Sequence, residues 1–233
     1  MVIYRMGLIA LAMIASANIA AAQNSQPDSN KPATAASPDP SPADSGTSME
    51  NALPGDHWTY EVKDEITGDL KLTTTNIVTD VSATELNVRT GAVGSAGNGN
   101  LVYDHAWNVK DTGTWKFSPN DGSGIKLPLK AGSTWSFRGS DILAGRTLWK
   151  RSGTSKVVGE ESVTTKAGTF NTFKIETSIT VSGANDPTKK VQVATTLWYA
   201  PAIDHWVKRT SKTQTNGHVR ESSSLELVEY GRQ

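Results

Sequence analysis

The sequence predicts an all-β protein with a single domain of antiparallel strands that form a curled sheet, a half-barrel or a sandwich. Three observations predict this fold class. Apolar and polar residues alternate with a period of two almost everywhere after residue 55, and turn signals that contain glycine separate the alternating runs. No window of a dozen residues carries a sustained apolar stripe at helical spacing. Short runs joined by tight turns favour antiparallel neighbours.

Residues 1–22 have the composition of a signal peptide. Arg5 supplies a short positive start, an apolar run follows over 6–19, and three alanines at 20–22 form a small-residue cleavage site. The apolar run is rich in alanine and shorter than the roughly 20 apolar residues that a membrane-spanning helix needs. We therefore expect export, to the periplasm or out of the cell, with no transmembrane anchor left after cleavage. The alternative is an uncleaved anchor.

Residues 23–50 are predicted to be a disordered tether. This segment has five prolines, many small polar residues and no aromatic residue. It cannot bury enough apolar surface to offset the entropy lost on ordering. The β-rich domain is therefore expected to occupy residues 51–233, a length that suits one domain with one core.

Charge and cysteine content exclude several classes of partner and chemistry. The predicted domain holds 21 basic and 19 acidic residues, and this small net charge gives no electrostatic reason to expect nucleic acid as a partner. Cysteine is absent, which excludes disulfides, thiolate catalysis, cysteine-bound metals and lipid attachment at a cysteine. The protein must depend on its core for stability.

The first predicted strand, over residues 57–62, belongs to a pattern that occurs twice. A glycine is followed by aromatic residues three and five positions later and by a second glycine thirteen positions later. The two sets are Gly55, Trp58, Tyr60, Gly68 and Gly132, Trp135, Phe137, Gly145. If this pattern is a true internal repeat, the sheet consists of two related β-meanders; the alternative is a chance match of four residues.

A long strand is predicted over residues 169–182, after a two-residue turn at Ala167–Gly168. Its apolar residues share one face from Phe173 onward, but Phe170 is out of phase with them. A β-bulge near 171–172 would bring both phenylalanines inward and bend the strand. Bent long strands favour a half-barrel over a flat sandwich.

The strand over residues 191–199 places its last two aromatic rings on opposite faces of the sheet. Tyr199 is expected in the core, and Trp198 on the other face, with Trp206 of the next strand as its neighbour across the hairpin. Either a second layer covers these tryptophans or they line a concave groove. The groove interpretation predicts a ligand-binding set of four residues: Trp198, Trp206, Trp107 and Trp149.

Catalytic and metal-binding patterns are weak. Three histidines, His57, His105 and His205, each follow an aspartate, but adjacent residues on a strand point to opposite faces, so neither could orient the other. No serine-hydrolase elbow, phosphate loop or dinucleotide fingerprint occurs. Basic pairs such as Lys208–Arg209 are interpreted as solvated strand positions. We expect no enzyme activity, no cofactor and no metal site.

Several stretches together resemble a known group of proteins. They are "PGDHWTYEV" at 54–62, "AGTFNTFKIET" at 167–177, "LWYAPAIDHWVK" at 197–208 and "LELVEY" at 225–230. The chain resembles exported bacterial β-proteins known only as domains of unknown function, which are distantly similar to lipoprotein-carrier half-barrels that hold acyl chains in a concave sheet. The resemblance implies no catalytic residues. The chain departs from the group at Asp204–His205, where a small residue such as glycine is expected after WYAP.

The sequence therefore favours an exported, non-enzymatic protein that binds an apolar or amphipathic small molecule in a curved β-sheet. One alternative is a module of the cell envelope that binds another protein or has a structural role. The other is a hydrolase that uses at least two of His57, His105 and His205 brought together in one cleft.

Overall fold

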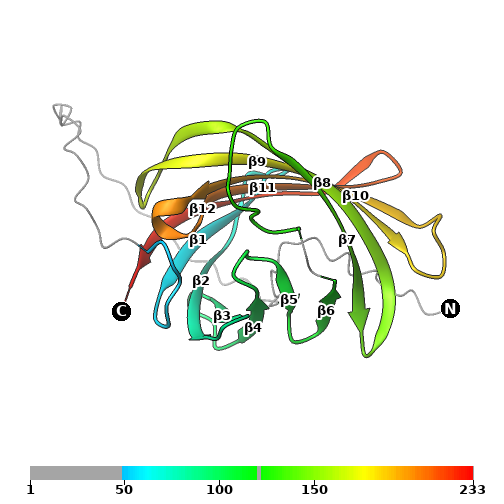
Figure 1. Cartoon of the computed structure of the whole chain (residues 1–233), viewed down its shortest axis with the longest axis horizontal. Helices are drawn as coiled ribbons and strands as arrows, with labels where there is room; N and C mark the ends of the chain where they lie inside the picture. Colours follow the sequence, from blue (N-terminus) through cyan, green and yellow to red (C-terminus); the bar gives the residue numbers. More distant parts are fainter. Residues whose placement is uncertain (1–48, 120–121, 233) are drawn as a thin grey trace, which may run out of the picture.

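The computed structural model describes residues 49–119 and 122–232, which form one antiparallel sheet closed into a barrel (Figure 1). The predicted leader 1–22 and nearly all of the predicted tether 23–50 lie outside the described residues. The strands in chain order are β1 (His57–Asp64), β2 (Leu70–Val81), β3 (Leu86–Ala92), β4 (Asn98–Tyr103), β5 (Val109–Asp111), β6 (Trp115–Ser118), β7 (Thr134–Leu143), β8 (Arg146–Thr165), β9 (Gly168–Gly183), β10 (Lys190–Ala200), β11 (His205–Thr215) and β12 (His218–Gly231). A 3₁₀ turn, η1 (Pro201–Ile203), joins β10 to β11. No helix in the described part of the chain is long and apolar enough to cross a membrane.

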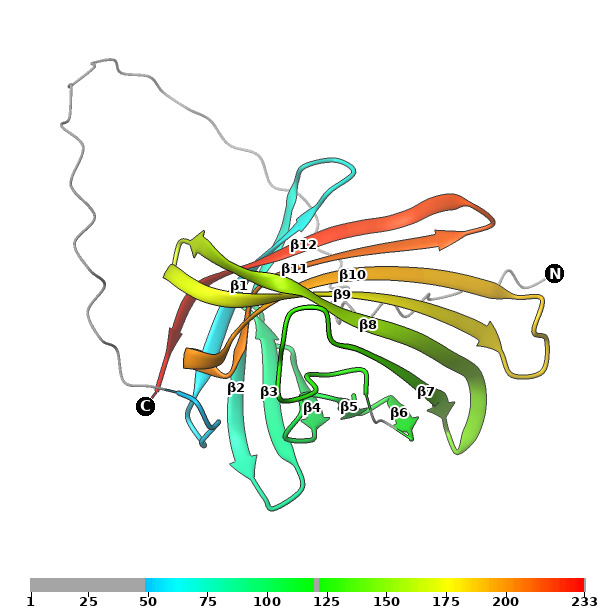
Figure 2. The same ribbon diagram turned by 45° about the horizontal axis from the view of Figure 1, so that its top comes forward.

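The predicted all-β, antiparallel fold is confirmed, and the sheet is curled to the point of closure. Every strand pairs antiparallel with its neighbour in the chain, and β1 also pairs with β12. Strands β8 to β12 form a broad curved wall, and strands β2 to β6, of which β3 to β6 are short, lie across from it (Figure 2). Closure leaves few unpaired strand edges. The contact between β5 and β6 is the narrowest, with one residue pair, Asp111 and Lys116.

Aromatic side chains fill one end of the barrel. Trp58 and Tyr60 alternate with polar residues along β1 and are fully buried, as the period-two pattern predicts. Burying side chains of this size contributes about 1.5 to 3 kcal/mol each. Met49 is also buried, and its backbone N–H donates to the carbonyl of Ala202 (2.9 Å), so the packed chain extends at least two residues before position 51.

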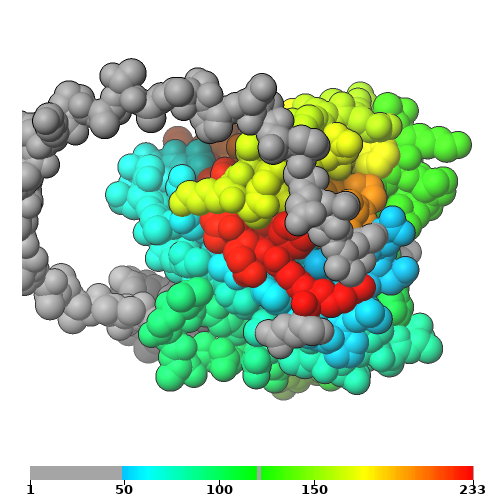
Figure 3. Space-filling model, turned by 90° about the vertical axis from the view of Figure 1, so that its left-hand side faces the viewer, coloured from blue at the N-terminus to red at the C-terminus, as the bar shows by residue number. Residues whose placement is uncertain are grey.

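The end of the chain helps to close this part of the barrel. Figure 3 shows atoms of β12 between those of the β8–β9 turn and those near the start of β1. The rings of Phe170 and Tyr230 meet edge to face, with centroids 5.6 Å apart. Arg232 donates two hydrogen bonds to the carboxylate of the buried Asp56, at 2.7 and 2.9 Å. This ion pair ties the C-terminal end to the turn before β1.

The internal repeat seen in the sequence has a counterpart in the backbone. Gly55 and Gly132 both have a positive φ, of 95° and 84°, and each precedes the first strand of a six-strand meander, β1 to β6 or β7 to β12. Three backbone hydrogen bonds occur in equivalent places in the two halves. In the first half they are Gly55 N–H to Val78 O, Val78 N–H to Asp56 O and Asp56 N–H to Leu53 O; in the second, Gly132 N–H to Val157 O, Val157 N–H to Ser133 O and Ser133 N–H to Lys130 O. The matching bonds support two related meanders.

The long strand predicted at 169–182 is β9, and the bulge lies on its neighbour. β9 pairs with β10 without interruption, whereas its pairing with β8 shifts between Val157 and Gly159. The extra residue, Val158, therefore lies in β8 and not near 171–172. Phe170 is nevertheless buried, with its ring against that of Tyr230 (centroids 5.6 Å apart), and Phe173 is partly buried.

Candidate ligand-binding site

The inner face of the barrel lines a cavity of about 130 Å³. Aliphatic and aromatic residues form most of its wall: Val62, Leu101, Tyr103, Trp107, Val109, Ile125, Ile175, Ile179, Leu197, Trp206 and Leu225. Polar uncharged side chains also line it: Thr74, Asn76, Thr90, Ser123, Thr177, Thr195, Ser211 and Ser223. Among the described residues that line the cavity, Arg209 alone carries a full charge at neutral pH. The cavity therefore joins apolar surface, hydrogen-bonding groups and one cation.

Trp107 enters the interior from a tight turn after β4. Its φ is 58°, an unfavourable value for a bulky residue. The carboxylate of Asp104 supports the turn by accepting hydrogen bonds from the backbone N–H groups of Ala106 and Asn108, both at 2.9 Å. Strain of this kind costs about 1 to 3 kcal/mol and persists only where the surroundings hold it.

Other aromatic rings hold Trp107 in place. Its centroid lies 5.7 Å from that of Trp58, 5.4 Å from that of Tyr103 and 4.5 Å from that of His205, all in edge-to-face geometry. Its indole N–H donates to the carboxylate of Asp204 (3.1 Å). The ring is thus a rigid part of the cavity wall.

The segment 122–125 packs directly against the Trp107 turn. The backbone N–H of Ile125 donates to Ala106 O (2.6 Å), and that of Gly124 donates to the side-chain oxygen of Asn108 (2.6 Å). A Cβ atom at Gly124 would lie 2.0 Å from the same Ala106 oxygen, so only glycine fits this approach. The contact holds Ile125 in the cavity wall.

A β-bulge turns Trp206 into the barrel, contrary to the predicted pairing with Trp198. Tyr199 pairs with Trp206 and Trp198 pairs with Lys208, so Val207 is an extra residue on β11. One extra residue moves Trp206 to the same face as Tyr199. Trp206 lines the cavity, and its ring centroid lies 6.1 Å from that of Trp107.

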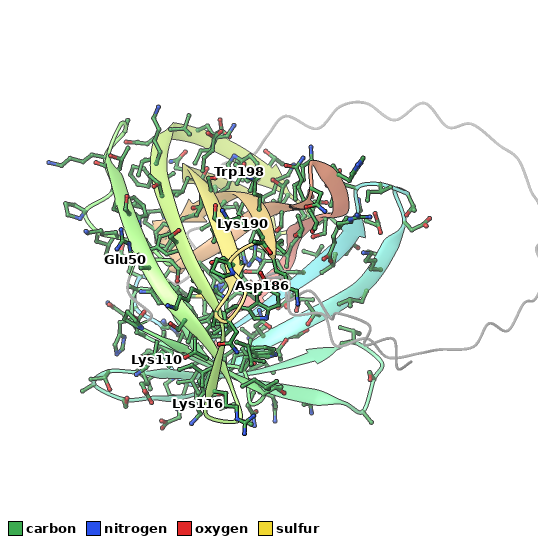
Figure 4. All side chains as sticks on the ribbon, turned by 90° about the vertical axis from the view of Figure 1, so that its right-hand side faces the viewer. Glu50, Lys110, Lys116, Asp186, Lys190 and Trp198 are labelled. Carbon is green, nitrogen blue, oxygen red and sulfur yellow. The ribbon has the colours of Figure 1, made fainter. Side chains whose placement is uncertain are left out.

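Trp198 lies on the outer surface of the barrel, as its alternation with the buried Tyr199 predicts. The ammonium nitrogens of Lys174 and Lys208 lie 5.3 and 5.6 Å from its ring centroid, and its N–H donates to the carboxylate of Glu161. Figure 4 shows Trp198 high on the barrel wall, apart from Lys190 and Asp186. Trp198 does not line the cavity.

Trp149 lines a different hollow, further along the inside of the barrel. This hollow measures about 480 Å³ and also contains Val191, Thr213 and Lys190. Of the four predicted residues, the structure therefore brings together Trp107 and Trp206, places Trp149 elsewhere on the inner face and leaves Trp198 outside.

The interpretation of Arg209 as a solvated strand position is wrong. Arg209 pairs with Leu197 of β10 and Leu225 of β12 on the inner face, and its side chain is partly buried at the cavity. Burial lowers the pKa of Arg209, an effect opposed by the nearby phenols of Tyr103 and Tyr60. A guanidinium keeps its charge in proteins in spite of such a shift.

A signal for the inward position of Arg209 was available in the sequence. Lys208 and Lys212 are four residues apart and share one face of a strand, which assigns Arg209 to the opposite face.

His205 is buried among the aromatic rings next to the cavity. Its ring stacks on Trp58 with centroids 4.3 Å apart, and burial lowers the pKa of His205 to about 3. The hydroxyl of Tyr60 donates to the carbonyl of Trp206 (2.9 Å) and lies 2.7 Å from Nδ1 of His205. Because a phenol has only one proton, Nδ1 donates to the phenol oxygen. The lowered pKa keeps the imidazole neutral at physiological pH.

The other two histidines that follow an aspartate, His57 and His105, do not line the cavity. Nε2 of His57 bonds to the carboxylate of Glu229 (2.8 Å) on the outside, and Nε2 of His105 bonds to the carbonyl of Ser82 (2.9 Å) at the surface. Within residues 49–119 and 122–232, no group of three His, Cys, Asp or Glu side chains is placed to hold a metal ion.

Asp204 explains the departure from the expected small residue after WYAP. Its φ is 45°, in the left-handed region that favours glycine and that aspartate also tolerates. Its carboxylate accepts hydrogen bonds from the Tyr199 hydroxyl (2.6 Å) and the Trp107 indole (3.1 Å). Burial raises the pKa of Asp204. The aspartate thus connects η1 to the two rings beside the cavity.

Residues 153–224 match a family model described as DUF3108-like. This match confirms the resemblance to proteins with a domain of unknown function, and the AGTF and WYAP stretches both lie inside it. No curated protein matches the chain.

Three solved structures align with most of the chain at low sequence identity. A lipoprotein candidate from Parabacteroides distasonis has 14% identity and a TM-score of 0.47, and the alignment covers 79% of this chain and 99% of that one. A candidate exported protein with a YmcC-like fold from Bacteroides fragilis has 15% identity, a TM-score of 0.48 and the same coverage. The hypothetical lipoprotein YmcC from Escherichia coli has 14% identity and a TM-score of 0.47, with 77% of this chain and 86% of that chain covered.

Proposed function

We propose that this protein binds an amphipathic small molecule inside its barrel, outside the cytoplasm, and catalyses no reaction. The proposal depends on the cavity on the inner face of the barrel. Its walls are mostly apolar and also carry polar side chains. Small-molecule sites are concave, mostly apolar and equipped with a few polar groups that orient the ligand. Export rests on the signal-peptide composition of residues 1–22.

The distribution of polarity in the cavity favours an amphipathic ligand. Each of three neighbouring strands supplies both kinds of group: Ile175 and Thr177 on β9, Leu197 and Thr195 on β10, and Leu225 and Ser223 on β12. A wholly apolar ligand would leave these polar groups without partners, at a cost of about 1 to 3 kcal/mol for each group that stays buried. A wholly polar ligand would lose hydrogen bonds to water against the aliphatic wall.

The test is the binding of a neutral, environment-sensitive dye, N-phenyl-1-naphthylamine. The wild-type protein is expected to raise the dye's fluorescence in a saturable way. Thr195→Phe places a ring in the cavity and is expected to weaken binding at least about tenfold, because it overfills the space. Thr196→Phe changes the next residue on β10, which alternates to the outer face, and serves as the matched control.

Two results would count against the proposal. One is that the wild-type protein shows no saturable binding of the dye. The other is that Thr195→Phe and Thr196→Phe bind the dye equally well while both remain folded by circular dichroism. In that case the dye would be bound at another surface.

A further inference from the structure

We infer that the ligand is a chain with an uncharged hydrogen-bonding group in its interior and apolar segments on both sides of that group. This inference rests on the proposed function and specifies the ligand class. It starts from a row of hydroxyl side chains that crosses the inner face of the sheet, with one residue from each of the strands β8 to β12. This row, the hydroxyl belt, consists of Ser155, Thr177, Thr195, Ser211 and Ser223.

Strand pairing places the belt residues side by side. Thr177 pairs with Ser155 on β8 and with Thr195 on β10. Ser211 pairs with Thr195 and with Ser223. Side chains directly opposite each other on neighbouring strands have Cβ atoms about 5 Å apart. Because the belt residues of β9 to β12 all line the cavity, one ligand group can reach two hydroxyls at once.

Apolar side chains flank the belt toward both ends of the barrel. On β9 the inner-face order is Ile175, Thr177 and Ile179, all three line the cavity, and successive inner-face residues lie roughly 7 Å apart along a strand. Toward the other end from the aromatic rings, Ile179 packs with Phe137 and Val193 in a buried apolar cluster. Toward the aromatic end, the adjoining row is mostly aliphatic and consists of Val157, Ile175, Leu197, Arg209 and Leu225. A ligand whose polar group lies at the belt therefore meets apolar surface on both sides.

The belt can bind a polar group that carries no charge. Ser211 is only 7% exposed, and its hydroxyl has no hydrogen-bond partner among residues 49–119 and 122–232. The hydroxyls of Ser155 and Thr177 lie 2.9 Å apart in one hydrogen bond, which uses only one of their two protons. A carbonyl oxygen has two lone pairs, so an ester placed here can accept from Ser211 and Thr195 together. An ionised group would need a compensating charge, which hydroxyls do not supply.

The experiment uses two ester isomers as competitors for bound N-phenyl-1-naphthylamine, each below its solubility limit. Hexyl hexanoate has its ester in the middle of the chain, whereas methyl undecanoate, which is built from the same atoms, has it at one end. The wild-type protein is expected to bind hexyl hexanoate about 3- to 10-fold more tightly, the range for one hydrogen bond. Because the isomers have nearly the same apolar surface, general hydrophobicity would not separate them.

Matched double variants test whether the preference comes from the belt. Thr195→Val with Ser211→Ala removes two paired belt hydroxyls and is expected to bind the two isomers equally, while the dye still binds. Thr196→Val with Thr210→Val changes the neighbouring pair, which alternates to the outer face of the same two strands. This control is expected to keep the wild-type preference.

The outcomes separate this inference from the proposed function. Equal affinity of the wild-type protein for the two isomers, failure of both to displace the dye, or an unchanged preference in Thr195→Val with Ser211→Ala would overturn the inference and leave dye binding intact. Absence of dye binding to the wild-type protein would remove the proposed function as well. The comparison of the isomers needs only the wild-type protein, so the test does not depend on the folding of a variant.

Discussion

Lowering the pH from 7 to 5 should destabilise this protein through His205. Burial lowers the pKa of His205 to about 3, from an ordinary value of 6.5. Between these two values the unfolded chain binds a proton at this histidine and the folded protein does not, so the free energy of unfolding falls as the pH falls. The linkage relation gives a loss of roughly 2 kcal/mol between pH 7 and pH 5, since the folded-state pKa lies below this window.

Urea denaturation followed by tryptophan fluorescence at pH 5, 6 and 7 measures this loss. His205→Phe keeps a ring between Trp58 and Trp107 but cannot titrate, so its unfolding free energy is expected to vary about 2 kcal/mol less over the same range. His218→Phe, at an exposed hairpin position, should retain the full wild-type slope. The neighbouring Asp204 has a raised pKa, which gives a contribution of opposite sign, but wild type and variant share it. Equal slopes for wild type and His205→Phe would refute the reasoning.

Three further predictions concern packing and binding. Gly124→Ala should destabilise the protein by about 1 to 3 kcal/mol in urea denaturation, because its Cβ would meet the backbone of the Trp107 turn, whereas Gly159→Ala, with open space around it, should change stability little. Asp56→Ala should lower the unfolding free energy by about 1 to 3 kcal/mol, since it removes the buried carboxylate that accepts hydrogen bonds from Arg232 and from the backbone N–H of Leu53; a loss below about 0.5 kcal/mol would show that these bonds contribute little. Trp206→Ala should weaken binding of N-phenyl-1-naphthylamine, while Trp198→Ala on the outer face should not; equal effects of the two would contradict the assignment of the cavity.

Period-two alternation predicted the strands well because a strand with one buried face must alternate. Trp58 and Tyr60 on β1, and Tyr199 opposite Trp198 on β10, lie on the faces that their sequence parity indicates. The glycine and aromatic repeat was also informative, because a positive φ before a strand requires a specific residue type. These features are local, so one stretch of chain determines them.

The structure separates the predicted set of four tryptophans, and strand register decides which of them reach the cavity. Val207 on β11 is one extra residue, and it moves Trp206 from the outer face to the cavity. Nothing in the local sequence marks Val207 as a bulge. The same strand carries Arg209, whose inward position could have been inferred from the lysines on the other face but became significant only once the barrel had enclosed it.

The sequence by itself determined the all-β character, the turns and the alternation of buried and exposed side chains, because these depend on backbone conformation and on the nearest residues in the chain. Only the tertiary structure decided that the sheet closes, which tryptophans share a cavity and that a single arginine faces apolar walls. Those properties depend on register between strands far apart in the sequence. A shift of one residue at a bulge exchanges the inner and outer faces without any visible change in composition.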